Sequence, residues 1–241
     1  AGPDPADPNS LAQPAPVLDG LDEPDLSDAT LGICTPWFQD AEPGVVEACT
    51  AMLDELRRAG CRVEEVELPD LGLLRTVHTV IIVSEMAAAH LQMFGKHRKH
   101  YAHDVRLNLD LAGRLKASDY VHAQRLRLGL CRQFESLMQR VDGIVSPATG
   151  CTAKPVLDKG RKTGVSDLGQ TDTVMRFARP ANATGLPAIS FPAGYDPDGL
   201  PVGLQVMGRA FDEVRLLRIA AVAEGICQRR RPQIHWDLLG A

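Results

Sequence analysis

The sequence has 241 residues, of which 44% are hydrophobic and 24% charged, and its formal net charge at neutral pH is −5. This length and composition suit one large domain or two small ones, and they exclude a chain that is disordered along most of its length. The acidic charge gives no reason to expect nucleic acid or an anionic membrane as a partner.

Neither a membrane span nor a secretory signal is evident in the sequence. The longest apolar run, VIIV at 80–83, is far shorter than the roughly 18 to 20 residues that cross a bilayer. The first ten residues have neither a basic start nor an apolar stretch, and the six cysteines are scattered without a C-x-x-C pair. We therefore expect an intracellular location, cytoplasmic or organellar, with reduced thiols and no transmembrane segment.

The first part of the chain predicts a connector followed by a compact unit. Residues 1–30 carry six Pro and six Asp with little periodicity, which is typical of an extended connector. A short apolar strand at 31–35, a helix with apolar residues at helical spacing over 45–56 and a strand at 61–69 follow. Gly60 suits the end of that helix, because glycine adopts a left-handed cap without strain. Strand, helix and strand predict a right-handed parallel βαβ unit.

The middle of the chain predicts two long helices, a buried strand and a long loop. One helix covers about 73–94, and the second begins at Ser118, a plausible N-cap, and shows an apolar stripe at three- and four-residue spacing. The letters IVSP at 144–147 indicate a short buried strand. Residues 147–172 carry few large apolar groups and are predicted to be a loop, of the length that is usually functional or mobile.

The last part predicts a strand pair and a final helix. AISFPAGY at 188–195 and PVGLQVM at 201–207 flank DPDG at 196–199, where proline presets one turn dihedral and glycine accepts a positive φ. Gly203 inside a strand indicates a bulge or the close approach of another backbone. A helix over 212–227 ends the pattern. The predicted fold class is α/β, with a mixed and buried central sheet flanked by helices.

The residues alone identify no catalytic centre. The sequence lacks a G-x-S-x-G nucleophile elbow, a P-loop, a G-x-G-x-x-G loop and an S-x-x-K motif. Lys154 follows Cys151 closely enough to favour a thiolate, but nothing beside them suggests a base or an oxyanion hole. A loop cysteine is therefore the preferred interpretation of Cys151.

The sequence also predicts no metal and no cofactor. His97, His100 and His103 are spaced three apart, which would place them on one helical face, but the intervening lysines and arginine disfavour a cation. Arg176 and Arg179 flank an aromatic residue in a region expected to face a cleft. A surface position or pairing with carboxylates explains these two arginines equally well.

One ordered pattern near the C-terminus resembles a known family. Asn182-x-x-Gly185-Leu186-Pro187-Ala188-x-Ser190-x-Pro192-x-Gly194, followed by Gly199-Leu200-Pro201-Val202-Gly203-Leu204-Gln205, Gly208, Phe211-Asp212-Glu213 and Leu216-Leu217, resembles the C-terminal end of the amidase signature family. Weaker similarities cover LGICTPWF, GCRVEEVELP, DYVHAQRLR, VDGIVSPATG and AGPDPADPNS. The pattern is most similar to plant-type fatty acid amide hydrolases. The resemblance implies that residues 31–241 are the C-terminal part of a single amidase-signature domain that follows the connector.

The resemblance also implies what this chain lacks. Members of the family hydrolyse amides with a Ser nucleophile, a bridging Ser and a Lys base, all in the N-terminal half of the domain. Nothing in this sequence resembles that half, so no catalytic residue can be assigned and we expect the chain alone to be inactive. The N-terminal amidase half is then an implied partner, covalently attached or as a separate chain.

The function implied is that of the part that forms the substrate pocket of a hydrolase acting on a linear amide such as a fatty amide. The candidate substrate-binding residues are Thr173, Met175, Arg176, Phe177 and Asn182, although Met175 and Phe177 are equally compatible with ordinary core positions. Two alternatives stay open: an inactive amidase-like scaffold subunit in a larger assembly, and an amidotransferase A-type subunit. The acidic charge disfavours contact with tRNA through this chain.

Overall fold

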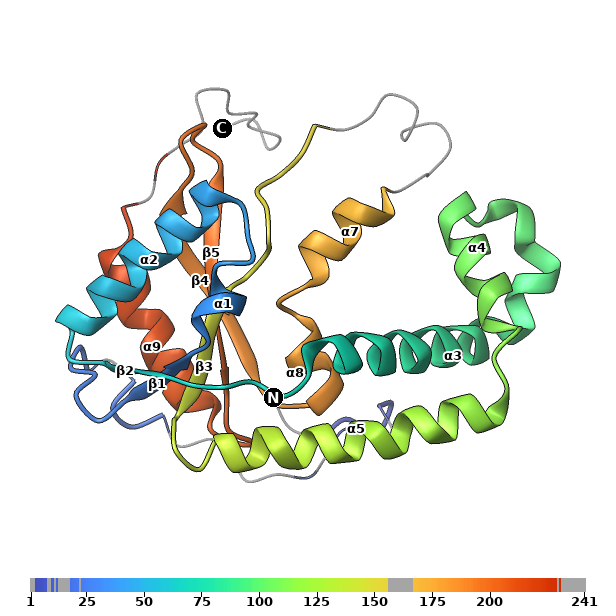
Figure 1. The fold of residues 1–241 in the computed structure, drawn as a ribbon, viewed down its shortest axis with the longest axis horizontal. Helices are drawn as coiled ribbons and strands as arrows, with labels where there is room; N and C mark the ends of the chain where they lie inside the picture. The colour runs from blue at the N-terminus through green and yellow to red at the C-terminus, as the bar shows by residue number, and fades with distance from the viewer. Residues whose placement is uncertain are drawn as a thin grey trace.

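The computed structural model describes residues 3–7, 10, 12, 18–21, 23–155, 167–228 and 230. Its centre is a five-stranded mixed sheet in the order β2-β1-β3-β5-β4 (Figure 1). β2, β1 and β3 run parallel to one another, whereas β5 runs antiparallel to both β3 and β4. The strands are β1 (Thr30–Ile33), β2 (Arg62–Glu65), β3 (Gly143–Pro147), β4 (Ala188–Tyr195) and β5 (Pro201–Gly208). The predicted α/β class with a mixed sheet flanked by helices is confirmed.

Helices pack on both faces of this sheet and also extend beyond it. They are α1 (Thr35–Phe38), α2 (Pro43–Arg58), α3 (Leu71–His97), the 3₁₀ turn η1 (Arg98–His100), α4 (His103–Ala112), α5 (Ala117–Leu137), α7 (Leu168–Met175), α8 (Arg179–Thr184) and α9 (Glu213–Ile226). The predicted βαβ unit is β1, α2 and β2, with Gly60 in the left-handed region at φ 101°. In the predicted loop over 147–172, α7 begins at Leu168, and residues 156–166 lie outside the described part.

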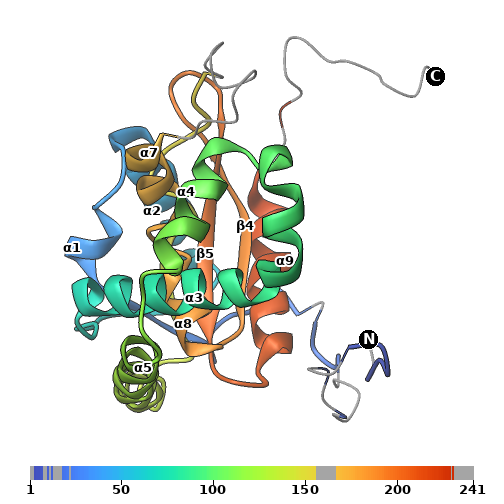
Figure 2. The same cartoon turned by 90° about the vertical axis from the view of Figure 1, so that its right-hand side faces the viewer.

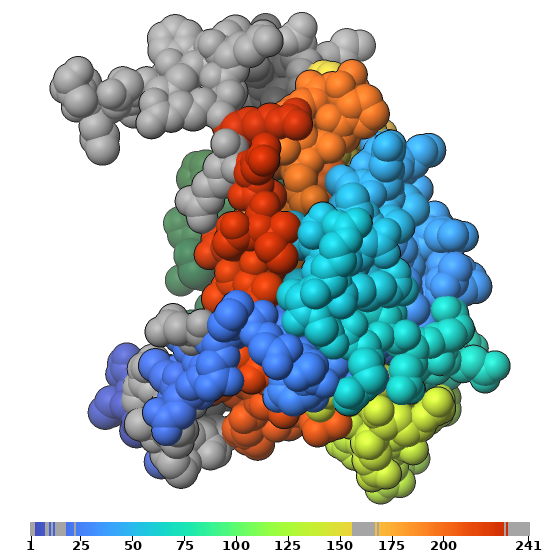
Figure 3. Space-filling model, turned by 90° about the vertical axis from the view of Figure 1, so that its left-hand side faces the viewer, coloured from blue at the N-terminus to red at the C-terminus, as the bar shows by residue number. Residues whose placement is uncertain are grey.

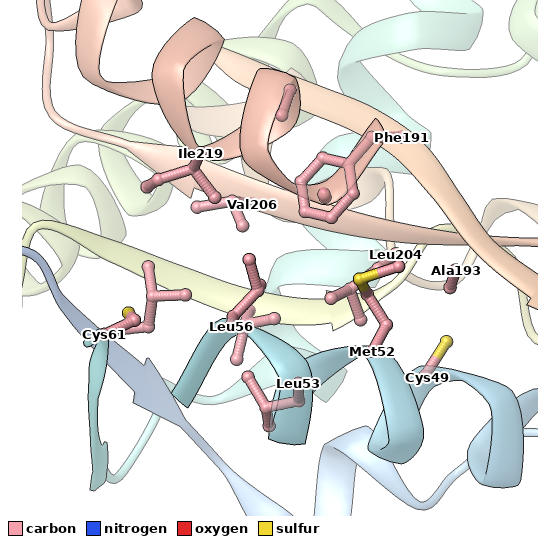
Figure 4. Close-up of a cluster of buried hydrophobic side chains, with 14 of the residues drawn as sticks. Cys49, Met52, Leu53, Leu56, Cys61, Phe191, Ala193, Leu204, Val206 and Ile219 are labelled. Carbon is pink, nitrogen blue, oxygen red and sulfur yellow. The ribbon is translucent and has the colours of Figure 1, made fainter. Parts of the chain in front are cut away.

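Two helices cover one face of the sheet. Figure 3 shows α2 and α9 lying side by side on this face. Their apolar sides bury one core against alternate residues of β4 and β5, as the close-up in Figure 4 shows for Leu56, Phe191 and Val206. Burying a side chain of this size contributes about 1.5 to 3 kcal/mol, so this face supplies a large part of the stability of the fold.

The opposite face carries a second core, formed with α1, α3, α5 and α8. Phe134 of α5 and Phe177, which precedes α8, are both fully buried there. Trp37 of α1 packs against Phe177 with ring centroids 5.0 Å apart. This second core continues along β3 and β5 through Ile144 and Met207, but the side chains of β4 on this face, Ala188, Ser190 and Pro192, are exposed.

Three helices form an arm that extends from the sheet. α3 and α5 run side by side away from the strands, and α4 lies against the far end of α3 (Figures 1 and 2). In the arm, Tyr101 packs edge-on against His90 and Phe94, and Arg98 forms a bidentate pair with Asp110. His97 ends α3 and His100 ends η1, which continues it, and their rings stack with centroids 5.8 Å apart, whereas His103 begins α4.

α3 differs from the expectation that no segment has the length and composition of a membrane span. The helical stretch Leu71–His100 is apolar enough to cross a membrane, with a mean hydropathy of 1.4 in a window that is 17% buried. The expectation rested on uninterrupted runs of apolar residues. Ser84, Glu85 and His90 interrupt the apolar residues of α3, so each uninterrupted run in it is short. Length and composition alone are weak evidence for a span.

The predicted strand pair is present, with the turn where it was expected. Gly199 has φ 79°, and Asp196 accepts hydrogen bonds from the backbone N–H groups of Asp198 and Leu200. A register shift between Pro192 and Gly194 marks a bulge in β4. A Cβ atom at Gly203 would lie 3.1 Å from that of Ala148, which explains the glycine by close approach.

Candidate functional site

The five candidate substrate-binding residues lie on one segment, from Thr173 near the end of α7 to Asn182 in α8. Two hydrogen bonds fasten this segment to the sheet and its loops. The buried amide of Gln205 on β5 donates to the carbonyl oxygen of Phe177 at 3.0 Å. The N–H group of Gly150, after β3, donates to the carbonyl oxygen of Thr173 at 3.1 Å. The position of the segment is therefore set by the strands beneath it.

The apolar candidates on this segment have different surroundings. The Phe177 side chain is 0% exposed and lies in the second core against Trp37. Thr173 and Met175 are half-buried. The contact of these residues with a substrate stays a prediction. A core position for Phe177 is compatible both with a residue that lines a substrate pocket and with an ordinary core residue.

Arg176 lines a cavity of about 340 Å³ between α1, the start of α3 and the α7–α8 segment. Its guanidinium pairs with the carboxylate of Asp40 and donates to the carbonyl oxygen of the same residue at 2.6 Å. Arg179 lines the same cavity and pairs with Asp172 at 2.5 Å. Both arginines thus pair with carboxylates and also line a cavity, and the contact of Arg176 with a substrate stays a prediction.

Asn182 lines a second cavity of about 520 Å³, further along α3. A hydrogen-bonded series borders it: Tyr120 donates to Glu85 at 2.8 Å and accepts from Gln124 at 2.9 Å. The series continues from Gln124 to Arg127, which donates to the carbonyl oxygen of Ala183 in α8 at 2.8 Å. Sequence reasoning missed these groups, although the spacing of Tyr120, Gln124 and Arg127 by four and three residues indicates one polar helical face.

His78 stands between the two cavities on α3. It is buried and lines the second cavity. Burial, and then the positive charge of Arg179, lower the pKa of His78. The side chain is therefore held in its neutral form, in which one ring nitrogen can accept a hydrogen bond.

Cys151 has the surroundings of a structural thiol. It is buried, and its pKa is raised by burial first and by the charge of Glu42 second. Lys154, the residue that could have favoured a thiolate, pairs with Glu42 instead. Among residues 23–155 and 167–228, no group of three potential metal ligands is found.

Comparison with known proteins identifies the family. The family model described as Amidase matches residues 1–217. The chain therefore belongs to the amidase signature family.

Among its relatives, a fatty acid amide hydrolase of Medicago truncatula is 39% identical over the whole chain, which covers 41% of that protein. An amidase of Pseudomonas putida is 32% identical over the whole chain, with 52% of the relative covered. The solved structure of the A subunit of glutamyl-tRNA(Gln) amidotransferase from Thermotoga maritima aligns with a TM-score of 0.72 at 25% identity, over 92% of this chain and 48% of that one. The chain thus spans about two-fifths to half the length of these relatives.

Proposed function

We propose that this chain forms a wall of the substrate pocket in an amidase-type hydrolase, with the Ser-Ser-Lys catalytic residues supplied from outside these 241 residues. The observation that carries the proposal is the segment Thr173–Asn182, which is fastened to the sheet by Gln205 and Gly150 and is bordered by two cavities. In an amidase the wall must hold its shape while the carbonyl is attacked, because misplacement of the reacting atoms slows the reaction.

The proposed substrate is a linear amide, with a fatty amide as the favoured type. The similarity to the fatty acid amide hydrolase of Medicago truncatula supports this substrate class. We also propose an intracellular location, cytoplasmic or organellar. The six cysteines, all unpaired, support a reducing compartment.

The proposed partner is the catalytic half of an amidase, covalently attached or as a separate chain. Two surfaces of this chain support the proposal. β4 pairs with β5 on one side and with no other described strand, and an open strand edge is a site for further pairing. α3 exposes Ile82, Leu91 and Met93, which a packed partner would cover.

The amidotransferase A-type alternative rests on a specific observation, the structural similarity to the Thermotoga maritima protein. That alternative keeps the fold and changes the substrate. The inactive scaffold alternative predicts the same fold without a serine nucleophile in the assembly.

The test isolates the native polypeptide with an antibody against residues 182–207 and treats it with a fluorophosphonate probe, which labels activated serines. We expect a labelled serine in a Gly/Ser-rich segment, in the same polypeptide or in a partner that co-purifies, together with hydrolysis of oleamide. A native assembly without such a segment in any of its polypeptides would refute the proposal and favour the scaffold. Hydrolysis of glutamine in place of oleamide would favour the amidotransferase.

The purified 241-residue chain provides a control. We expect it to hydrolyse no oleamide, because the proposed Ser-Ser-Lys residues lie outside it, and because burial and the charge of Glu42 raise the pKa of the Cys151 thiol. Turnover by the purified chain that is lost in Cys151→Ala would show that the catalytic centre had been misplaced.

A further inference from the structure

Three guanidinium groups line the cavity that contains Arg176. Arg75 of α3 joins Arg176 and Arg179 in its lining, and the carboxylates that line it are those of Asp40 and Asp172. The three cations exceed the two anions by one, so the cavity carries a surplus positive charge. Trp37, Leu71 and Pro180 supply apolar wall beside these charges.

The nearby Asp70 is not part of the cavity lining, and its carboxylate faces the start of α3. It is the N-cap of α3, and its carboxylate accepts a hydrogen bond from the backbone N–H group of Leu73. Its charge is set against the partial positive charge of the helix N-terminus. The charges that line the cavity are therefore three guanidinium groups and two carboxylates.

The three arginines differ in how far their partners satisfy them. Arg179 is 13% exposed and Arg176 is half-buried, and each has a carboxylate within hydrogen-bond distance. Arg75 is 59% exposed, and its ion-pair contact within the described residues is a distance of 4.0 Å to Asp172, a carboxylate that Arg179 already holds. Arg75 therefore has donors to offer to a ligand.

The pKa of the neighbouring His78 responds to the positive charge in this cavity. Besides its burial, the positive charge of Arg179 lowers the pKa of His78, one turn of α3 beyond Arg75. An anion bound beside Arg179 would offset this charge, whereas a bound cation would add to it.

We propose that this cavity binds the carboxylate group of a small organic acid, with Arg75 and Arg179 as the guanidinium groups that receive it. The planar fork of a guanidinium matches the two oxygens of a carboxylate, and one surplus positive charge balances one negative charge. The carbon chain of the acid contacts Trp37 and Pro180 at the apolar wall. This binding does not depend on amide hydrolysis or on a catalytic half.

The test measures binding to the 241-residue chain by isothermal titration calorimetry, after circular dichroism has shown that the chain is folded. The ligands are hexanoate, the uncharged isostere hexanamide and inorganic phosphate. We expect hexanoate to bind more tightly than hexanamide and than phosphate, because the amide lacks the charge and the phosphate dianion exceeds the one-charge surplus.

Two variants and a control locate the site. Arg75→Gln is expected to weaken hexanoate binding about tenfold, the size of a lost charge-assisted hydrogen bond. Asp172→Asn is expected to strengthen it, since it removes the carboxylate that competes for Arg75 and Arg179. Arg58→Gln on α2 changes an exposed arginine outside the cavity and is expected to leave binding unaltered.

Three outcomes would overturn the proposal. They are equal binding of hexanoate and hexanamide, equal affinities in Arg75→Gln and Arg58→Gln, and tighter binding of phosphate than of hexanoate. None of them bears on the proposed pocket wall of an amidase, which the serine-labelling experiment tests separately.

Discussion

At the scale of single residues, the most informative side chain is the buried amide on β5, between β3 and β4. Gln205 on β5 lies in register with Ser146 on β3 and Ser190 on β4, so a row of polar residues crosses three strands. A buried amide is costly unless it is hydrogen-bonded, and here it binds the carbonyl oxygen of Phe177. This residue therefore joins the sheet to the segment that carries the candidate site.

Replacing that amide tests the connection. Gln205→Leu leaves the carbonyl oxygen of Phe177 without its donor, so we expect a loss of about 1 to 3 kcal/mol in the free energy of unfolding. Urea titration measures the loss. Gln139→Leu, at an exposed position after α5, is the matched control and is expected to stay within about 0.5 kcal/mol of the parent. Equal stability of the two variants would contradict a role for Gln205 in holding the segment.

His78 makes stability depend on pH in a defined direction. Its pKa in the folded chain is lowered by burial and by Arg179, so the unfolded chain binds a proton more readily. The stability that the neutral side chain contributes is present above the ordinary histidine pKa and is lost as the pH falls through the lowered one. Urea titrations at pH 7 and pH 5 measure how much the free energy of unfolding falls between these pH values. We expect a smaller fall in His78→Asn than in the parent, and equal falls would contradict a lowered pKa of His78 as the cause.

At the scale of elements, α7 depends on a glycine in the loop after β3. A Cβ atom at Gly150 would lie 2.8 Å from the carbonyl oxygen of Thr173, and the N–H group of Gly150 donates to that oxygen. The loop and the helix can approach this closely because position 150 has no side chain. The contact is one of two that keep the candidate segment on the sheet.

An alanine at this position should separate the two elements. For Gly150→Ala we expect a loss of about 1 to 3 kcal/mol and faster hydrogen exchange over residues 168–175, with α2 unaffected. Gly129→Ala in α5 is the control: no atom lies within 4 Å of the added Cβ, so we expect it to stabilise the chain by about 0.5 to 1 kcal/mol. Unchanged exchange in α7 of Gly150→Ala would show that the contact is not needed.

The elements that sequence reasoning predicted are those whose signal is local. Apolar spacing indicated α2 and α9, and the residues of the 196–199 turn indicated the β4–β5 pair. α4 was missed because its residues alternate between apolar and polar from Val105 to Leu111, a strand-like pattern that contact with α3 overrides. α8 was missed because it is short, although Pro180 at its start and Gly185, with φ 77°, at its end were usable signals.

The contacts of the candidate segment could not be predicted from the sequence, and its role as a site stays a prediction. The segment Thr173–Asn182 was found through its resemblance to a family. The pairing of Arg176 with Asp40 and the bond from Gln205 to Phe177 join residues far apart in the chain, and no local pattern encodes such partners. The cavity of Arg75, Arg176 and Arg179 forms when α3 and the α7–α8 segment meet, so no sequence pattern indicated Arg75.

At the scale of the whole molecule, the two sides of the sheet are unequally covered. α2 and α9 bury one face, while β4 is open on the other and α3 exposes apolar side chains along the arm. Leu91 is 78% and Met93 56% exposed. We expect the isolated chain to associate with itself through these side chains at high concentration.

Removing the apolar side chains at the end of the arm tests this expectation. The double variant Leu91→Gln and Met93→Gln should keep the free energy of unfolding within about 0.5 kcal/mol and sediment as a smaller species at high concentration. Leu217→Gln on α9 also replaces an exposed leucine and is the control that should associate like the parent. Association unchanged in the double variant would place the associating surface elsewhere, with β4 as the next surface to examine.

The β4–β5 turn has a consequence for the order in which the chain folds. Because the turn residues Asp196 to Gly199 set the register locally, these two strands can pair within about 1 to 10 μs, before distant segments meet. Pairing of β3 with β5 closes the chain segment between β3 and the hairpin, and pairing of β1 with β3 closes the long helical arm, so both are slower because closing a long loop costs entropy. We therefore expect the β4–β5 hairpin to form first and the rest of the sheet to assemble on it.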